Sequence, residues 1–210
     1  MPIRVVLADD HVLVRQGLKS LLEREKFQVV GEASDGQEAV RLVESLHPDI
    51  AVIDISMPVQ NGIETVRELA HSNPKTRTIL LTQHEEDQYI YEALEAGVKG
   101  YVLKNQVSSD LVHAIQSACA GSVYLSPGVS RAVVEGFRNK SQRPSDPLTV
   151  RERQVLQLIA EGKSTKDVAS LLGISVKTAE SHRTRLMQKL DIHETATLVR
   201  YAVRRGLVEP

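Results

Sequence analysis

The first 120 residues alternate short apolar runs with amphipathic stretches, which is the pattern of strands followed by helices. Four of the five apolar runs are nearly continuous, as in parallel strands that are covered on both faces. The predicted strands are Ile3–Ala8, Gln28–Ala33, Ile50–Ile53, Thr78–Leu81 and Gly100–Leu103. The helical periods between and after them predict helices at 12–25, 36–46, 62–72, 86–96 and 108–119. Five such units predict a flavodoxin-like α/β domain with a five-stranded, doubly wound parallel sheet.

The pattern changes after Gly121, where the alternation of strands and helices stops. Pro127–Arg138 has the pattern of one more helix, and the polar, proline-containing segment Arg138–Pro147 is typical of a solvated linker. Residues 148–206 contain only helical patterns, the last of them at Glu194–Arg205, and predict a four-helix domain. The predicted divisions are an α/β domain at 1–122, a linker with a helix at 123–145 and a helical domain at 146–210.

Several of the predicted helices begin with capping signals. A side chain that caps a helix is followed three residues later by an acid in the capping-box pattern. This pattern occurs at Asp35 with Glu38, at Thr149 with Glu152 and at Ser164 with Asp167. Ser175, which follows Gly173-Ile174, is expected to cap the next helix.

Charge is distributed unevenly along the chain. The formal net charge is −1, yet residues 1–130 sum to −7 and residues 131–210 to +6. Only the second part is therefore expected to bind polyanions such as nucleic acid. Cys119 is the only cysteine, the N-terminus resembles no secretory signal, and no apolar run approaches the ~20 residues that span a bilayer. A reducing cytoplasm, away from membranes, is the expected location.

Polar side chains stand where four of the predicted strands end. Asp9 and Asp10 follow the first strand, Asp54 the third, Thr82 the fourth and Lys104 the fifth. The carboxyl ends of parallel strands lie at one edge of the sheet, where open α/β domains bind ligands. Carboxylates gathered there require a cation, for which Mg²⁺ is the usual hard ion. Asp54 can then be the nucleophile toward a phosphoryl group, with Lys104 adding positive charge and Thr82 a hydrogen bond.

Each of these residues alone has an ordinary structural explanation, because an acid at a strand end commonly caps a helix. Their conjunction at four strand ends favours a functional site. A metal phosphohydrolase that passes through an aspartyl phosphate would need a second acid two residues after Asp54, where Ser56 stands. A flavin site would offer phosphate-binding amides and hydroxyls after the first strand, whereas Asp9 and Asp10 repel phosphate. The sequence therefore predicts a chain that is not an enzyme.

The motifs VVLADDH, IAVIDISMP followed by NGIE, ILLTQ and GYVLK occur in this order over about 120 residues. Together they resemble the receiver domain of two-component response regulators. The resemblance implies that Asp54 is phosphorylated, that Asp9, Asp10, Asp54 and the backbone carbonyl of Ser56 hold Mg²⁺, and that Thr82 and Tyr101 form a switch pair. Two residues depart from the usual pattern. Asn105 stands where many receivers have proline, and Gln83 replaces a small residue beside the switch hydroxyl.

The segment LTVRERQVLQLIAEGKSTKDVASLLGISVKTAESHRTRLMQKLDI resembles the LuxR-type helix-turn-helix of NarL/FixJ regulators. The second helix of the helix-turn-helix motif, which begins after Ser175, has an apolar stripe. At 100° per residue, its opposite face is polar and is expected to lie in the major groove. Lys177, Ser181 and Thr184 are predicted at base edges, with Glu180 an acceptor for cytosine. Thr178, Arg185 and Lys189 flank this face and are predicted at phosphates.

The resemblance implies a response regulator that a sensor histidine kinase phosphorylates on Asp54. The phosphorylated chain is expected to form a homodimer and bind double-stranded promoter DNA, with RNA polymerase a further candidate partner. In this subfamily the receiver often blocks the DNA-reading helix until it is phosphorylated. The alternatives are a regulator that binds DNA without phosphorylation, under dimer or partner control, and an adaptor that binds only proteins. The charge of +6 and the intact DNA-reading helix disfavour the adaptor.

Overall fold

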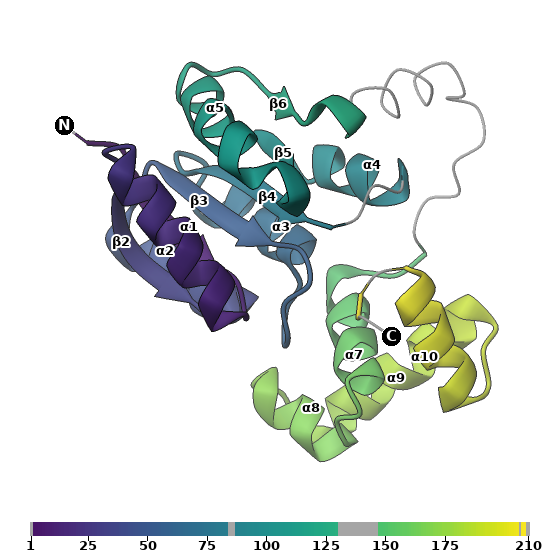
Figure 1. The fold of residues 1–210 in the computed structure, drawn as a ribbon. Coiled ribbons are helices and arrows are strands. Elements are labelled where there is room, and N and C mark those ends of the chain that lie inside the picture. The colour runs from purple at the N-terminus through teal and green to yellow at the C-terminus, as the bar shows by residue number, and fades with distance from the viewer. Residues whose placement is uncertain (1, 84–86, 130–146, 206, 209–210) are drawn as a thin grey trace. The chain divides into compact units, whose positions relative to one another are not determined.

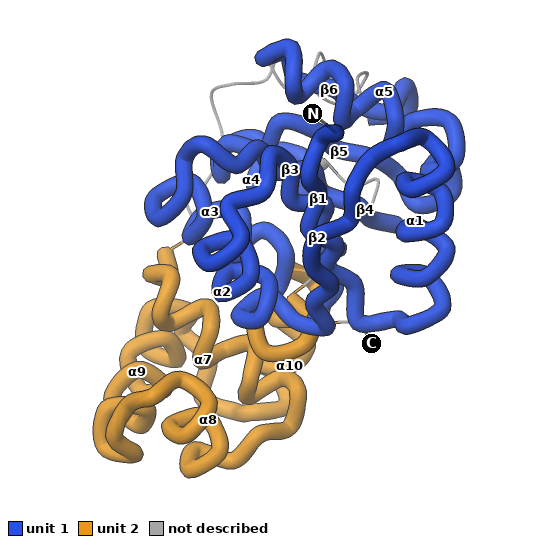
Figure 2. Tube along the Cα trace, turned by 90° about the vertical axis from the view of Figure 1, so that its left-hand side faces the viewer, with its two compact units in different colours: residues 1–57, 61–142 blue, residues 58–60, 143–210 orange. Residues whose placement is uncertain are grey.

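The computed structural model describes residues 2–83, 87–129, 147–205 and 207–208 (Figure 1). The chain divides into two compact units, which Figure 2 shows in different colours. Residues 1–57 and 61–142 form the first unit, and residues 58–60 and 143–210 form the second. The first unit is an α/β domain and the second is a helical domain.

Parallel strands form the sheet of the α/β domain, in the order β2-β1-β3-β4-β5-β6. The strands are β1 (Arg4–Ala8), β2 (Gln28–Ala33), β3 (Ile50–Asp54), β4 (Arg77–Thr82), β5 (Gly100–Leu103) and β6 (Tyr124–Leu125). The five predicted strands are confirmed, with ends that differ by at most one residue. The register places Ala8 beside Ile53 and Thr82 beside Leu103, so that β1, β3, β4 and β5 end at a common edge.

The prediction of five strands is wrong by one, because β6 adds a short sixth strand beside β5. Two residues are too few to show an alternating pattern in the sequence. Ser126, which follows β6, is fully buried and its N–H donates to the carbonyl of Tyr101 at 3.0 Å. Its hydroxyl donates to Asp110 at 2.6 Å and accepts from the N–H of Leu103 at 3.3 Å. Hydrogen bonds on both sides of Ser126 therefore hold this segment to the sheet.

Helices cover both faces of the sheet (Figure 1). They are α1 (Val12–Arg24), α2 (Gly36–Leu46), α3 (Gly62–Ser72), α4 (Asp87–Glu95) and α5 (Val107–Cys119), with a 3-10 turn at Lys104–Gln106. α1 and α5 pack on one face, where Leu22 and Ile115 belong to the same apolar cluster as Val52. α2, α3 and α4 pack on the other face, where Val43 and Ile90 belong to the same apolar cluster as Ile53. Two apolar layers thus enclose the strands, as their nearly continuous apolar runs predict.

The capping box predicted at the start of α2 is only half formed. The side chain of Asp35 accepts from the N–H of Glu38 at 2.8 Å, as expected of an N-cap. The carboxylate of Glu38, however, accepts from the N–H and the hydroxyl of Ser34, at 2.8 and 2.9 Å. The reciprocal bond of the capping box is therefore made to Ser34, one residue before the N-cap.

The helical domain contains α7 (Val150–Ala160), α8 (Thr165–Leu171), α9 (Val176–Leu190) and α10 (Thr195–Arg204). The capping boxes predicted at Thr149 and Ser164 are both confirmed, and Ser175 caps α9 by accepting from the N–H of Thr178 at 3.1 Å. Gly173, at φ +63°, makes the left-handed turn between α8 and α9. The core of this domain contains Val155, Leu158, Val168, Ala179, Leu186 and Leu198.

Most of the predicted helix Pro127–Arg138 and of the linker Arg138–Pro147 lies outside the described residues. Within the described ranges, none of the helices combines the length and the apolar character that crossing a bilayer requires.

Candidate functional site

The structure brings the acids at the ends of β1 and β3 together. Asp54 is the last residue of β3, and Asp9 follows the last residue of β1. The Asp9 side chain is fully buried and that of Asp54 is 2% exposed, whereas Asp10 is partly exposed. The carboxylates of Asp9, Asp10 and Asp54, together with the ring of His11, offer ligand atoms that all lie within 4.8 Å of one another. Burial of several like charges at this spacing is costly without a compensating cation.

Lys104 supplies one positive charge to this cluster. Its Nζ lies 3.0 Å from Oδ2 of Asp9 and 2.9 Å from Oδ2 of Asp54. Burial lowers the pKa of the Lys104 ammonium, but the two carboxylates outweigh burial and hold that pKa above its ordinary value. Burial raises the pKa of the Asp54 carboxyl, with Asp9 and Asp10 adding to the rise and Lys104 opposing it. One ammonium therefore only partly balances the buried acids.

Three carboxylate oxygens in this cluster point to a second cation. Oδ2 of Asp9, Oδ1 of Asp10 and Oδ2 of Asp54 are buried, and Oδ1 of Asp10 lies 2.8 Å from Nδ1 of His11. The other two oxygens share the single ammonium of Lys104, so that the negative charge of the cluster exceeds the positive charge of Lys104. Buried oxygens of this kind fit a hard divalent ion, which ligates carboxylates directly. The donor set is therefore suited to Mg²⁺.

The predicted switch residues lie on β4, which is beside β3, and on β5, the next strand in the sheet. Thr82 is the last residue of β4 and is 1% exposed, while Tyr101 on β5 is fully buried. A cavity of about 440 Å³ opens next to this edge and is lined by Gln83, Leu103, Lys104 and Asn105. The two residues that depart from the usual receiver pattern, Gln83 and Asn105, therefore both line the approach to Lys104. Ser56 lies two residues beyond Asp54, in the segment that leads to α3.

Sequence reasoning did not single out Gly62, which packs against the backbone of Asp54. A Cβ at position 62 would overlap the Asp54 carbonyl oxygen, and the Gly62 N–H donates to the carbonyl of Ile55 at 2.9 Å. Asn61 caps α3 at the same point by accepting from the N–H of Glu64 at 2.9 Å. The Asn-Gly dipeptide was the available signal, since only glycine permits so close an approach.

In the helical domain, α9 exposes the residues that were predicted to contact DNA. The exposed set comprises Lys177, Thr178, Glu180, Ser181, Thr184, Arg185 and Lys189. Ser181 donates its hydroxyl to the carbonyl of Lys177 at 3.0 Å, which leaves its oxygen as an acceptor. The Thr178 hydroxyl lies 2.8 Å from that of Ser175. Lys177, Thr184 and Arg185 thus project from the same helix as these locally bonded hydroxyls.

Lys189 has a structural contact that its predicted position at a phosphate did not anticipate. Its Nζ lies 2.6 Å from Oε2 of Glu152, a nearly buried carboxylate at the start of α7. The same carboxylate oxygen accepts from the N–H and the hydroxyl of Thr149, at 2.8 and 2.9 Å. Arg183, which also lies on α9, donates to the hydroxyl of Thr195 at 2.9 Å. Lys189 ties α9 to α7, and Arg183 ties it to α10.

Two family descriptions match the chain. "Response regulator receiver domain" matches residues 5–116, and "Bacterial regulatory proteins, luxR family" matches residues 146–202. The first match covers the acidic cluster and Lys104, and the second covers α7 to α9 and most of α10.

Curated relatives match along nearly the whole chain. The oxygen regulatory protein NreC of Staphylococcus epidermidis is 37% identical over 216 residues, covering 98% of this chain and 99% of that protein. The transcriptional regulatory protein LiaR of Bacillus subtilis is 37% identical over 209 residues, with the same two shares. Among solved structures, a complex of the two-component response regulator RcsB with DNA has a TM-score of 0.62 at 28% identity, covering 96% of this chain and 98% of that chain.

Proposed function

This chain belongs to the response regulators that join a receiver domain to a luxR-family DNA-binding domain, and from that premise we propose that a phosphoryl group on Asp54 controls its binding to DNA. It is a DNA-binding transcription regulator and not an enzyme. The phosphoacceptor, the ion, the kinase and the DNA contacts are our proposals for this chain. So are the division into residues 1–122, 123–145 and 146–210, a cytoplasmic location and an active homodimer.

One observation carries the proposal. The Lys104 ammonium lies within 3.0 Å of carboxylate oxygens of both Asp9 and Asp54, so that one lysine serves a cluster of three carboxylates, those of Asp9, Asp10 and Asp54. A purely structural ion pair would match one carboxylate with one cation, whereas here three carboxylates are gathered around one ammonium, an excess of negative charge that a divalent cation would balance. Asp9, Asp10, Asp54 and the carbonyl of Ser56 are the proposed holders of Mg²⁺, which supplies charge neutralisation for phosphoryl oxygens when it is bound.

Asp54 acts as the nucleophile in the proposed transfer. An oxygen of its carboxylate forms a bond to phosphorus while the phosphorus–nitrogen bond of a phosphohistidine on the kinase breaks, and the imidazole leaves with a proton from solvent. Lys104 holds its positive charge beside the forming acyl phosphate, because its raised pKa keeps it protonated. Thr82, at the end of the neighbouring strand, donates its hydroxyl to a phosphoryl oxygen.

Phosphorylation then shifts a conformational population. The phosphoryl group adds negative charge and acceptors at the sheet edge, which favours one arrangement of Thr82 and Tyr101. Tyr101 is fully buried, so any change of its ring must repack the face of the sheet that α2, α3 and α4 cover. The resulting change in the receiver promotes dimerisation and DNA binding by α9. In that complex Lys177, Ser181, Thr184 and Glu180 read bases while Thr178, Arg185 and Lys189 contact phosphates.

Mass spectrometry after treatment with acetyl phosphate and Mg²⁺ tests this proposal. The full chain should gain one phosphoryl group, and Asp54→Asn should gain none. Ser56→Ala, which keeps the backbone carbonyl, is the matched control and should be modified like the parent chain. An adduct of equal yield in Asp54→Asn would place the phosphoacceptor elsewhere.

A further inference from the structure

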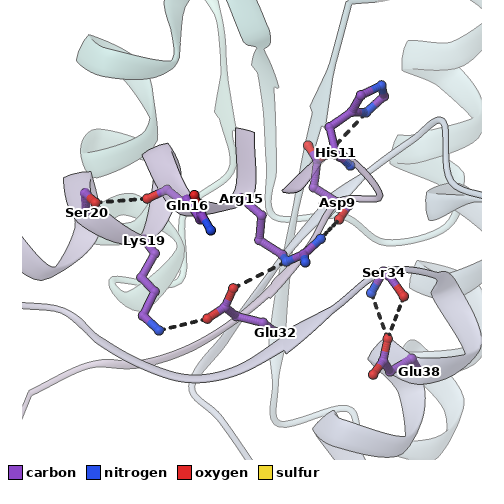
Figure 3. A network of polar contacts seen from close by, with 9 residues as sticks. All are labelled: Asp9, His11, Arg15, Gln16, Lys19, Ser20, Glu32, Ser34 and Glu38. Carbon is purple, nitrogen blue, oxygen red and sulfur yellow. Dashed lines mark hydrogen bonds and ion pairs between the residues drawn. The ribbon is translucent and has the colours of Figure 1, made fainter. Parts of the chain in front are cut away.

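Arg15 on α1 reaches back to the backbone of the acidic cluster. Its Nη1 donates to the carbonyl oxygen of Asp9 at 2.5 Å, as Figure 3 shows. The Arg15 side chain is only 15% exposed, although it lies on an otherwise exposed stretch of α1. A buried guanidinium that donates to a backbone carbonyl is a fixed and charge-assisted contact.

A carboxylate on β2 holds this guanidinium in place. Oε2 of Glu32 lies 3.3 Å from Nε of Arg15, and Oε1 lies 2.8 Å from Nζ of Lys19, one turn further along α1 (Figure 3). The hydrogen bond from Lys19, with help from Arg15, lowers the pKa of the Glu32 carboxyl in spite of some burial. Glu32 therefore remains charged between the two cations, and Arg15 keeps one fixed position.

The carbonyl that Arg15 binds belongs to the peptide joining Asp9 to Asp10. The N–H of Asp9, which belongs to the preceding peptide, donates to the carbonyl of Ala33 on β2 at 3.2 Å. Oδ1 of Asp9 accepts from the N–H of His11 at 2.8 Å. Both backbone groups of Asp9 are thus held, which fixes the peptide plane that carries the N and Cα atoms of Asp10.

We propose that Arg15 is a positioning residue for the Mg²⁺ site. By fixing the Asp9–Asp10 peptide, it holds two carboxylates at the spacing that one ion needs. Because an octahedral ion tolerates little misplacement of its ligands, release of this peptide weakens binding. This inference rests on the proposed function, since it assumes that Asp9 and Asp10 ligate Mg²⁺.

The sign of the effect separates positioning from charge. Arg15 is a cation near an acidic site, so its removal strengthens Mg²⁺ binding if it acts only through charge. Its removal weakens Mg²⁺ binding if it acts by holding the peptide. Lys19 offers a matched control, because it pairs with the same carboxylate and carries the same charge but does not contact Asp9 in the structure.

Titration calorimetry of the full chain with Mg²⁺ measures the difference. We expect Arg15→Met to weaken binding by about tenfold or more, the usual effect of removing a group that orients a metal ligand. Lys19→Met should bind as tightly as the parent chain or more tightly, and Arg15→Lys should restore part of the loss. If Arg15→Met does not fold, Arg15→Gln replaces it with the same expected loss. If the folded variant, Arg15→Met or Arg15→Gln, binds Mg²⁺ as tightly as Lys19→Met or more tightly, the proposal is overturned.

Two further measurements separate this proposal from its premise. The parent chain must bind Mg²⁺ and Asp10→Asn must lose that binding; otherwise the proposed metal site fails, whatever Arg15 does. Thermal unfolding in the presence of EDTA reports stability without the ion. A loss of Mg²⁺ affinity that exceeds any change in this unfolding temperature between Arg15→Met and Lys19→Met supports positioning. A loss of affinity that merely follows unfolding of the variant would contradict it.

Discussion

Gly62 lies so close to the backbone of Asp54 that the site has no room for a side chain at position 62. A Cβ on Gly62 would overlap the carbonyl oxygen of Asp54 and press on the backbone of Ile55. α3 therefore begins directly against the backbone of the proposed phosphoacceptor. The position of the end of β3 and the position of the start of α3 thus depend on each other.

Replacement of this glycine should disturb both folding and phosphorylation. We expect Gly62→Ala to destabilise the receiver by ~1–3 kcal/mol, as overpacking of a close contact does, and to lower the yield of the Asp54 adduct. Gly17→Ala is the control, because a Cβ at Gly17 on α1 meets nothing within 4 Å. Alanine there should be neutral or stabilising by up to ~1 kcal/mol. Urea unfolding measures the stability of both variants. Equal stability of Gly62→Ala and Gly17→Ala would show that the backbone at position 62 moves to make room for the added methyl group.

The sequence predicted the framework of this domain because its signals are local or repeat along the chain. The apolar runs at residues 50–53 and 100–103 mark the strands, and acids at strand ends must share one edge once the strands are parallel. β6 was missed because two residues carry no period. The contact of Arg15 with Asp9 was missed because it depends on the direction of a long side chain in three dimensions.

In the helical domain, too, the features with a local sequence pattern were predicted and a contact between distant residues was missed. Thr149 and Ser164 were predicted as caps because the capping box is a pattern of adjacent residues. The ion pair of Lys189 with Glu152 spans 37 residues and joins two helices, so no local pattern reveals it. A helical wheel places Lys189 on the polar side of α9 but does not show which charge lies opposite.

Glu152 should make the stability of the helical domain depend on pH. Burial raises the pKa of its carboxyl, but Lys189 and Thr149 outweigh burial and hold that pKa below its ordinary value of 4.5. Because the folded pKa is the lower one, this stabilisation is complete above pH 4.5 and is lost as the pH falls through the folded value. Hydrogen exchange of α7 and α9 amides, measured in the parent chain and in Glu152→Gln, should show a smaller acid-induced loss of protection in the variant.

Glu180→Gln, an exposed change on α9, serves as the control and should follow the parent chain. Identical pH profiles for Glu152→Gln and the parent chain would mean that the pair with Lys189 does not stabilise the folded domain.

DNA-binding measurements should distinguish the proposed phosphate contact of Arg185 from the proposed base contact of Lys177. Since Lys189 is engaged by Glu152, Arg185 is the cleaner test of a phosphate contact. Arg185→Ala should weaken binding to all sequences alike and reduce the slope of log affinity against log salt by about one. Lys177→Ala should instead change the preferred bases, with ~1–3 kcal/mol lost at one position of the site. Selection from random DNA at one salt concentration measures both, and unchanged preference in Lys177→Ala would contradict its assignment to a base.

The most direct test of phosphoryl control is the DNA affinity of the full chain with and without beryllofluoride and Mg²⁺, in the parent chain and in Asp54→Asn. Beryllofluoride takes the place of the phosphoryl group on an aspartate. A DNA fragment obtained by selection, at one salt concentration, serves for all four measurements. We expect beryllofluoride to tighten binding by the parent chain and to leave Asp54→Asn unchanged. Equal affinities in all four measurements would contradict control through Asp54 and favour a regulator that binds DNA without phosphorylation.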